Sequence, residues 1–85
     1  MTDTDRTWYV YLVECADGTL YTGITTDPQR RLQQHNAGRA ARYTRTRRPV
    51  RLVGAQPTEG RVAALKLEKR IKGWAPRRKR AFFET

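Results

Sequence analysis

Two short runs of β-branched and aromatic residues flank a turn near the N-terminus, and this arrangement constrains the fold more than any other feature. Residues 8–15 and 19–25 are both typical of strands. Asp17 and Gly18 between them form a dipeptide that favours a tight hairpin turn. The chain is therefore expected to begin with an antiparallel hairpin that carries several tyrosines.

The length of this turn decides which tyrosines share a face of the hairpin. With a two-residue loop of Asp17 and Gly18, Tyr11 and Tyr21 would lie on opposite faces. With a three-residue loop that ends on a left-handed Gly18, Tyr11 lies opposite Gly23 and shares a face with Tyr21. Only this second register predicts two neighbouring phenol rings, with open space at Gly23.

A helix is expected directly after the hairpin. Asp27 is a good N-cap, and Pro28 suits the first helical position, where its missing N–H has no partner to lose. The helix should run to about Ala37 and stop at Gly38. The basic residues 39–49 are expected to form a loop with a short helical turn.

The second half of the chain predicts one more strand and one more helix. Residues 50–55 favour a third strand, and Thr58 is expected to cap a helix over residues 61–73, which Pro76 interrupts. The pattern predicts one domain over residues 1–85, with a tail at 1–7, a core at 8–75 and a basic segment at 76–85. The apolar stripe of the second helix consists of Ala64, Leu67, Ile71 and Trp74.

The charge distribution indicates a polyanionic partner. Eighteen basic residues against eight acidic ones give a formal net charge of +10, and no carboxylate occurs between Asp27 and Glu59, where eight arginines lie. Guanidinium groups suit bidentate phosphate contacts, so we expect nucleic acid to bind this region. An aromatic residue within such a loop can stack on a base. The candidate binding residues are Arg39, Arg42, Tyr43, Arg45, Arg47 and Arg48.

Several classes of protein are disfavoured. Cys15 is the single cysteine, so neither an internal disulfide nor a cysteine zinc cage is expected. No apolar run approaches the roughly 20 residues that cross a bilayer, and the polar N-terminus does not resemble a signal peptide. A cytoplasmic protein without a membrane contact is the expectation. Nucleotide-binding glycine loops and a His-Glu-x-x-His motif are also absent from the sequence.

The first helix carries two residues that suit catalysis. Arg31 and His35 lie four residues apart, so they share a face of the helix. His35 is the single histidine, and its ordinary pKa near neutrality allows proton exchange at physiological pH. Arg31 can neutralise charge that develops on a phosphorane-like oxygen. The alternative interpretation is a pair of solvated residues on an exposed helix.

Only two carboxylates, Glu14 and Glu68, lie inside expected regular elements. Glu68 either pairs with Lys72 at i+4, worth roughly 0.3–0.5 kcal/mol, or holds a divalent cation at the edge of the core. A two-metal cluster needs several converging carboxylates, which the sequence does not offer. One hydrated Mg²⁺, held by one carboxylate and by substrate phosphate, is compatible with this composition.

These residues, taken in order, resemble the GIY-YIG nuclease superfamily, and in particular its small stand-alone members related to the catalytic domain of the excision-repair nuclease. The resemblance extends from about Trp8 to Trp74. It rests on five segments in order: Tyr9-Val10-Tyr11, Tyr21-Thr22-Gly23, residues 24–36, Arg42-Tyr43-Thr44-Arg45 and Leu67-Glu68-Lys69-Arg70-Ile71-Lys72. Two positions differ from the family pattern, since Tyr9 replaces a glycine and no asparagine follows Glu68.

The resemblance implies an α+β fold, with a three-stranded antiparallel sheet flanked by helices. It also implies metal-dependent hydrolysis of DNA phosphodiesters, using Mg²⁺ or Mn²⁺, in DNA repair or processing. Tyr11 and Tyr21 would then be the paired active-site tyrosines, with Tyr11 orienting or activating the water. Arg31 would stabilise the transition state, His35 would assist proton transfer or position Tyr11, and Glu68 would hold the metal. The identity of the general base stays open.

Two other functions remain compatible with the sequence. One is a non-catalytic nucleic-acid-binding module that keeps the fold and the charge. The other is a small basic protein that docks on a protein or ribonucleoprotein. For the nuclease itself, DNA against RNA and endonuclease against exonuclease stay open, and the thin apolar helices are compatible with a homodimer.

Overall fold

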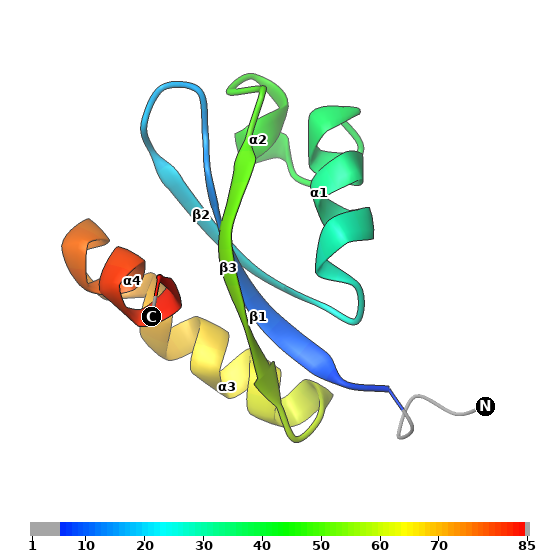
Figure 1. Ribbon diagram of the computed structural model, residues 1–85, viewed down its shortest axis with the longest axis vertical. Coiled ribbons are helices and arrows are strands. Elements are labelled where there is room, and N and C mark those ends of the chain that lie inside the picture. Colours follow the sequence, from blue (N-terminus) through cyan, green and yellow to red (C-terminus); the bar gives the residue numbers. More distant parts are fainter. Residues whose placement is uncertain (1–5, 85) are drawn as a thin grey trace.

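The computed structural model describes residues 6–84, so residues 1–5 of the expected tail lie outside the described part (Figure 1). One antiparallel sheet has the strand order β2-β1-β3 and is flanked by helices, which confirms the expected α+β fold. None of the helices within residues 6–84 is long and apolar enough to cross a membrane. The elements are β1 (Trp8–Glu14), β2 (Leu20–Thr25), α1 (Pro28–Asn36), α2 (Arg42–Arg45), β3 (Arg51–Thr58), α3 (Arg61–Lys72) and α4 (Pro76–Phe83).

The hairpin of β1 and β2 has the three-residue turn, as the second register predicts. The backbone N–H of Cys15 donates to the carbonyl of Thr19 at 2.8 Å, and Gly18 has a φ of 85°. Tyr11 therefore lies opposite Gly23. A Cβ on Gly23 would lie 2.5 Å from the Tyr11 hydroxyl oxygen, so the ring of Tyr11 occupies the space that the glycine leaves.

Side chains of β1 alternate between two apolar clusters, one on each face of the sheet. Tyr11 and Val13 belong to the first cluster, which Leu32 of α1 completes. Val10 belongs to the second cluster, with Ala64 and the other stripe residues of α3. Figure 1 shows α1 and α2 grouped on one side of the strands and α3 and α4 on the other. The central strand thus separates two small cores.

Local sequence signals account for the position of α1. The Asp27 carboxylate accepts a hydrogen bond from the Arg30 backbone N–H at 3.1 Å, and Pro28 opens the helix. At the other end, Gly38 has a φ of 77° and its N–H donates to the carbonyl of His35 at 3.1 Å. Both expected ends of the helix are confirmed, and they place His35 on its buried side.

The third strand and the start of α3 differ from expectation. β3 runs to Thr58, past Pro57, which an edge strand tolerates because its outer side pairs with no other strand of the described sheet. The predicted capping role of Thr58 is wrong. Its hydroxyl contacts the carbonyl oxygens of Trp8 at 2.8 Å and Gly60 at 3.0 Å, and α3 begins after Gly60 without a side-chain cap. Thr58 therefore contacts carbonyl oxygens and caps no backbone N–H of α3.

The basic C-terminal segment forms helix α4, which packs on the fold. Phe82 and Phe83 contact the second apolar cluster, and a Cβ on Gly54 of β3 would collide with the carbonyl oxygen of Phe83. Arg80 donates to Glu14 at 2.6 Å, and Glu14 also pairs with Arg51. Helix α4 therefore packs on the sheet through apolar contacts, a close backbone approach at Gly54 and the ion pair between Arg80 and Glu14.

Candidate nucleic-acid active site

A buried pair of side chains, one from β1 and one from α1, lies at the centre of the candidate site. The Tyr11 hydroxyl is 2.7 Å from Nε2 of His35, and His35 is 0% exposed. The other imidazole nitrogen, Nδ1, lies 2.8 Å from the hydroxyl of Thr44, which is also 0% exposed. Thr44 contacts the carbonyl oxygen of Ala41 at 3.1 Å. Three side chains and one carbonyl thus form a continuous hydrogen-bonded chain.

Thr44 was not among the residues that the sequence singled out. It lies on the four-residue helix α2, between Tyr43 and Arg45, in a segment whose charge draws attention to its arginines. The one available signal is its place within a segment that carries the family resemblance, and this does not predict burial. Its contact with His35 depends on how α2 packs against α1, which is a tertiary property.

Burial sets the protonation of the central pair. Desolvation lowers the pKa of His35 to about 4, and the nearby charge of Arg31 acts in the same direction. Desolvation raises the pKa of Tyr11 to about 12, and the charges of Tyr21 and Glu68 contribute in the same direction, whereas Arg31 opposes them. At neutral pH the imidazole is therefore neutral and the phenol keeps its proton.

Arg31 brings positive charge to this pair. Its Nη1 donates to Gln34 Oε1 at 2.9 Å, which holds the side chain along α1. Its Nε is buried and has no hydrogen-bond partner among the described residues. Because an unpaired buried N–H is costly, this group has donor capacity left for an anion.

Tyr21 joins the site through ring contacts. Its ring meets the edge of the His35 ring at a centroid distance of 5.3 Å and stacks with Tyr43 at 6.0 Å. The Arg47 guanidinium lies 4.0 Å from the centroid of the Tyr43 ring. Tyr43, expected to stack on a base, already has an aromatic and a cationic neighbour, and it is 38% exposed.

Glu68 approaches the site from α3. Its side chain is 17% exposed, and Oε2 lies 3.5 Å from Nζ of Lys72, which is the i+4 pair that the sequence offered. Its charge also acts on Tyr11 and contributes to the raised pKa of that phenol. Within residues 6–84 no group of three or more His, Cys, Asp or Glu residues could hold a metal. The donors present therefore fit a cation that keeps most of its water ligands and takes one carboxylate.

A hollow of about 250 Å³ lies next to the catalytic candidates and includes Arg31. Arg30 also lines this hollow and a neighbouring one of about 300 Å³ along α1. The residues around the first hollow are Trp8, Ile24, Thr25, Thr26, Asp27, Arg30, Arg31 and Gln34. Polar and cationic groups dominate, which suits a phosphate-bearing ligand more than an apolar one.

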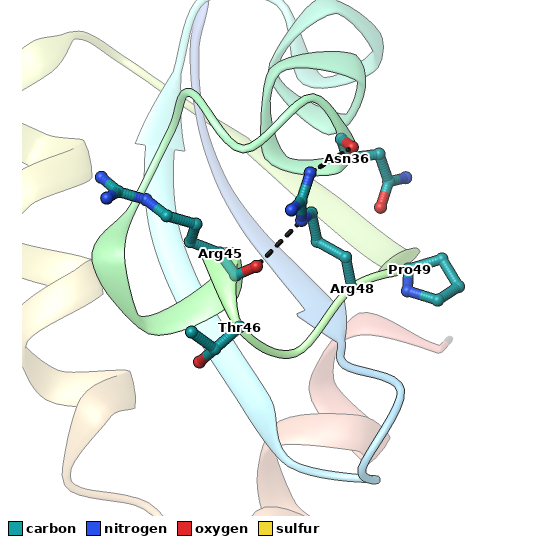
Figure 2. A pocket seen from close by; sticks show the side chains of 5 residues that line it. All are labelled: Asn36, Arg45, Thr46, Arg48 and Pro49. Carbon is teal, nitrogen blue, oxygen red and sulfur yellow. Dashed lines mark hydrogen bonds between the residues drawn. The ribbon is translucent and has the colours of Figure 1, made fainter.

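A larger hollow, of about 460 Å³, lies beyond the C-terminal end of α1 and contains none of the catalytic candidates (Figure 2). Arg48 donates from Nε to the carbonyl of Arg45 at 2.8 Å and from Nη1 to that of Asn36 at 3.3 Å. Figure 2 shows that the side chain of Arg45 extends away from Arg48. Arg48 thus joins two backbone segments, and Arg45 and Arg48 are both exposed.

The other basic candidates are distributed over the same end of the molecule. Arg39 and Arg42 are exposed. Arg47 is partly buried, pairs with Asp17 at 3.2 Å and donates to the carbonyl of Tyr43. Arg47 and Arg48 thus hold the loop through their hydrogen bonds. The exposed arginines from residue 39 to residue 48 are Arg39, Arg42, Arg45 and Arg48.

The domain of this chain is one that a known protein family shares. The GIY-YIG catalytic domain matches residues 7–81, and the chain belongs to this family, which defines a superfamily of nucleases. Members of this superfamily generally use a divalent metal, and their substrates are nucleic acids.

The relatives are UPF0213 proteins from several organisms. UPF0213 protein DP2720 of Desulfotalea psychrophila is 55% identical over 98% of this chain and 77% of its own length. UPF0213 protein Reut_B5558 of Cupriavidus pinatubonensis is 47% identical over 92% of this chain and 87% of its own. The solution NMR structure of EF2693 from E. faecalis matches with a TM-score of 0.62 and 37% identity, over 95% of this chain and 86% of that one.

Proposed function

We propose that this protein is a metal-dependent phosphodiesterase that cleaves a nucleic-acid backbone, with DNA as its substrate in repair or processing. The observation that carries the proposal is the 2.7 Å contact between Tyr11 and His35 beside the charge of Arg31. A phenol, an imidazole and a guanidinium in contact supply a proton relay and a site for negative charge. The excess of arginine around them supplies attraction for the substrate.

In this mechanism Tyr11 orients the attacking water through its phenolic oxygen. As the water oxygen bonds to phosphorus, the water proton passes to Tyr11 and the original Tyr11 proton passes to Nε2 of His35. Arg31 donates to the oxygens that gain charge, and Tyr21 borders the same face. The bond from phosphorus to the leaving oxygen then breaks, and that oxygen takes a proton from solvent.

The pKa values decide when the proton moves. The gap between a pKa of about 12 for Tyr11 and one of about 4 for His35 corresponds to on the order of 10 kcal/mol. Direct transfer from Tyr11 to His35 in the resting site is therefore unfavourable. The transfer becomes favourable only when it accompanies loss of the water proton during attack, so the relay is inactive without substrate.

Glu68 is the residue that would hold a divalent cation, and we propose Mg²⁺ or Mn²⁺. Such a cation would supply Lewis-acid polarisation of the scissile phosphate. With one carboxylate, the affinity of the free protein for metal is expected to be weak, since most ligands come from water and substrate. The ion pair with Lys72, at 3.5 Å, holds the carboxylate in place until then.

A cleavage assay with the two metals tests the proposal. Purified wild type should cleave labelled DNA, and Glu68→Ala and Arg31→Ala should each reduce the rate by about 100-fold or more. Glu59→Ala and Arg77→Ala, which change exposed residues outside the site, are the matched controls. Undiminished cleavage in both site variants would show that the assignment of the site is wrong.

The same assay separates the second candidate, a binding module without catalysis. The single carboxylate near Tyr11 favours this alternative, because it is a sparse metal site among the described residues. Salt-sensitive DNA binding with no cleavage in either metal, unaffected by Glu68→Ala, would support the binding module and contradict the nuclease.

A further inference from the structure

The chain of hydrogen bonds through His35 has two ends of opposite character. At one end lies the carbonyl oxygen of Ala41, which can only accept a hydrogen bond. At the other end the guanidinium of Arg31 lies beside the Tyr11 hydroxyl, and a guanidinium can only donate. Each of the three groups between these ends has both donor and acceptor capacity.

These ends give the chain a direction. Thr44 has one hydroxyl proton and donates it to Ala41, so its oxygen accepts the hydrogen on Nδ1 of His35. A neutral imidazole with its hydrogen on Nδ1 has a free lone pair on Nε2. Nε2 then accepts the hydrogen of Tyr11 at 2.7 Å.

The reverse direction is disfavoured at both ends. It would turn the Thr44 proton away from the Ala41 carbonyl and towards His35. It would also turn the Tyr11 hydroxyl proton towards the guanidinium of Arg31, which can only donate. Opposed donors in a buried site leave polar groups unpaired, which costs about 1–3 kcal/mol for each group.

We infer that Thr44 is a positioning residue, which holds His35 in the Nδ1–H tautomer so that Tyr11 presents lone pairs, not its proton, to the reacting water. This role in the reaction rests on the proposed function. Through Thr44, the short helix α2 would orient the proton relay. The same helix also carries exposed arginines. Thr44 acts through His35 and touches neither water nor phosphate.

The tautomer can be observed without any cleavage. In ¹⁵N NMR spectra of the wild type, His35 should show a protonated Nδ1 and an unprotonated Nε2 at neutral pH. Thr44→Val removes the hydroxyl at nearly constant volume, so Nδ1–H loses its acceptor and the Nε2–H form should become populated. Thr44→Ser keeps the hydroxyl and should restore the wild-type tautomer.

Thr22→Val is a matched control. Thr22 is 3% exposed, and its hydroxyl has no hydrogen-bond partner among the described residues. The change has the same chemistry at a similar burial, yet it should leave the His35 tautomer unchanged. A shift in both valine variants would reveal general loosening and overturn the assignment to Thr44.

Kinetics then distinguish the two proposals. Thr44→Val should lower kcat by roughly 10- to 100-fold with little change in KM, and Thr44→Ser should recover most of the rate. A wild-type protein in the Nε2–H form, or a Thr44→Val protein that keeps Nδ1–H, would overturn the inference. If the tautomers behave as stated but no form cleaves DNA, the proposed function fails and the hydrogen-bond direction stands.

Discussion

At the scale of single residues, the properties of His35 come from its neighbours. The sequence showed one histidine four residues from an arginine, which suggested proton exchange near neutral pH. In the fold this side chain is enclosed between Tyr11, Tyr21 and Thr44. Helical spacing predicted its face correctly, whereas its burial and its threonine partner depend on the packing of α2 and could not be predicted.

The pH dependence of stability should report this enclosure. The folded-state pKa of His35, about 4, lies below its ordinary value of 6.5, so between these pH values the unfolded chain binds the extra proton. Stability is therefore fully present above pH 6.5 and is lost as pH falls towards 4, by up to about 3 kcal/mol. Urea unfolding at a series of pH values measures this loss.

His35→Gln is the reference for that experiment. Glu14 and Asp17 also have lowered pKa values, because Arg80 and Thr19 respectively hydrogen-bond to them, and both lose stabilisation in acid. Subtracting the His35→Gln curve removes these shared contributions. Parallel curves for the two proteins between pH 6.5 and 4 would contradict the expected pKa of His35.

Gly23→Ala should damage the site selectively. The new Cβ would lie 2.5 Å from the Tyr11 hydroxyl oxygen, and the ring of Tyr11 is only 1% exposed, so close-packed neighbours resist its shift. We expect a loss of about 1–3 kcal/mol in the free energy of unfolding and disruption of the contact between Tyr11 and His35. Gly73→Ala is the control, since its nearest contact, the carbonyl oxygen of Arg70, is an ordinary 3.6 Å. Thermal unfolding and the ¹⁵N signals of His35 measure both effects.

At the scale of elements, the sequence predicted best where local chemistry terminates an element. Helix α1 starts and stops as expected because Asp27 and Gly38 act within a few residues of the chain. β3 extends three residues beyond its expected end at Ala55 because its pairing with β1 is long-range. Helix α4 was expected only as a basic segment, since its packing depends on contact between Phe83 and Gly54, 29 residues apart in sequence (83 − 54).

The contribution of α4 can be measured by substitution. Phe83→Ala removes a ring that packs on the second apolar cluster, so the free energy of unfolding should fall by about 2 kcal/mol or more. Val62→Ala, at a position on α3 that is 65% exposed, should change it by less than about 0.5 kcal/mol. Equal effects of the two substitutions in denaturant unfolding would mean that α4 is not part of the folded core.

At the scale of the whole molecule, the exposed arginines lie on the same side of the sheet as the contact between Tyr11 and His35. The exposed arginines of α2 and its flanking loops lie on the side of the sheet that carries the cluster with Tyr11. Composition favours a polyanionic partner, and the family resemblance groups the tyrosines with Arg31 and Glu68, whose charges act on Tyr11. The stacking of Tyr43 on Tyr21 and the hydrogen bonds of Arg48 could not be predicted from the sequence, because they depend on the three-dimensional arrangement.

DNA binding should therefore depend on salt in a position-specific way. Arg45→Ala should weaken binding and reduce the slope of log K against log [salt] by about 1, because one phosphate contact is lost. Arg78→Ala on α4, where the guanidinium lies 4.0 Å from the centroid of the Trp74 ring, is the control and should leave the slope unchanged. Fluorescence anisotropy over a range of NaCl concentrations measures both, and equal slopes for all three proteins would place the DNA elsewhere.

The complete enclosure of the single histidine also makes it an internal reporter. A reagent that acylates imidazoles can reach this ring only when α1 or α2 transiently separates from the sheet. The rate of modification would then measure how often such openings occur in the native protein, and no probe would have to be introduced. Bound substrate that holds those helices in place would slow the reaction, so the modification rate of a side chain that is buried in the closed fold would report occupancy.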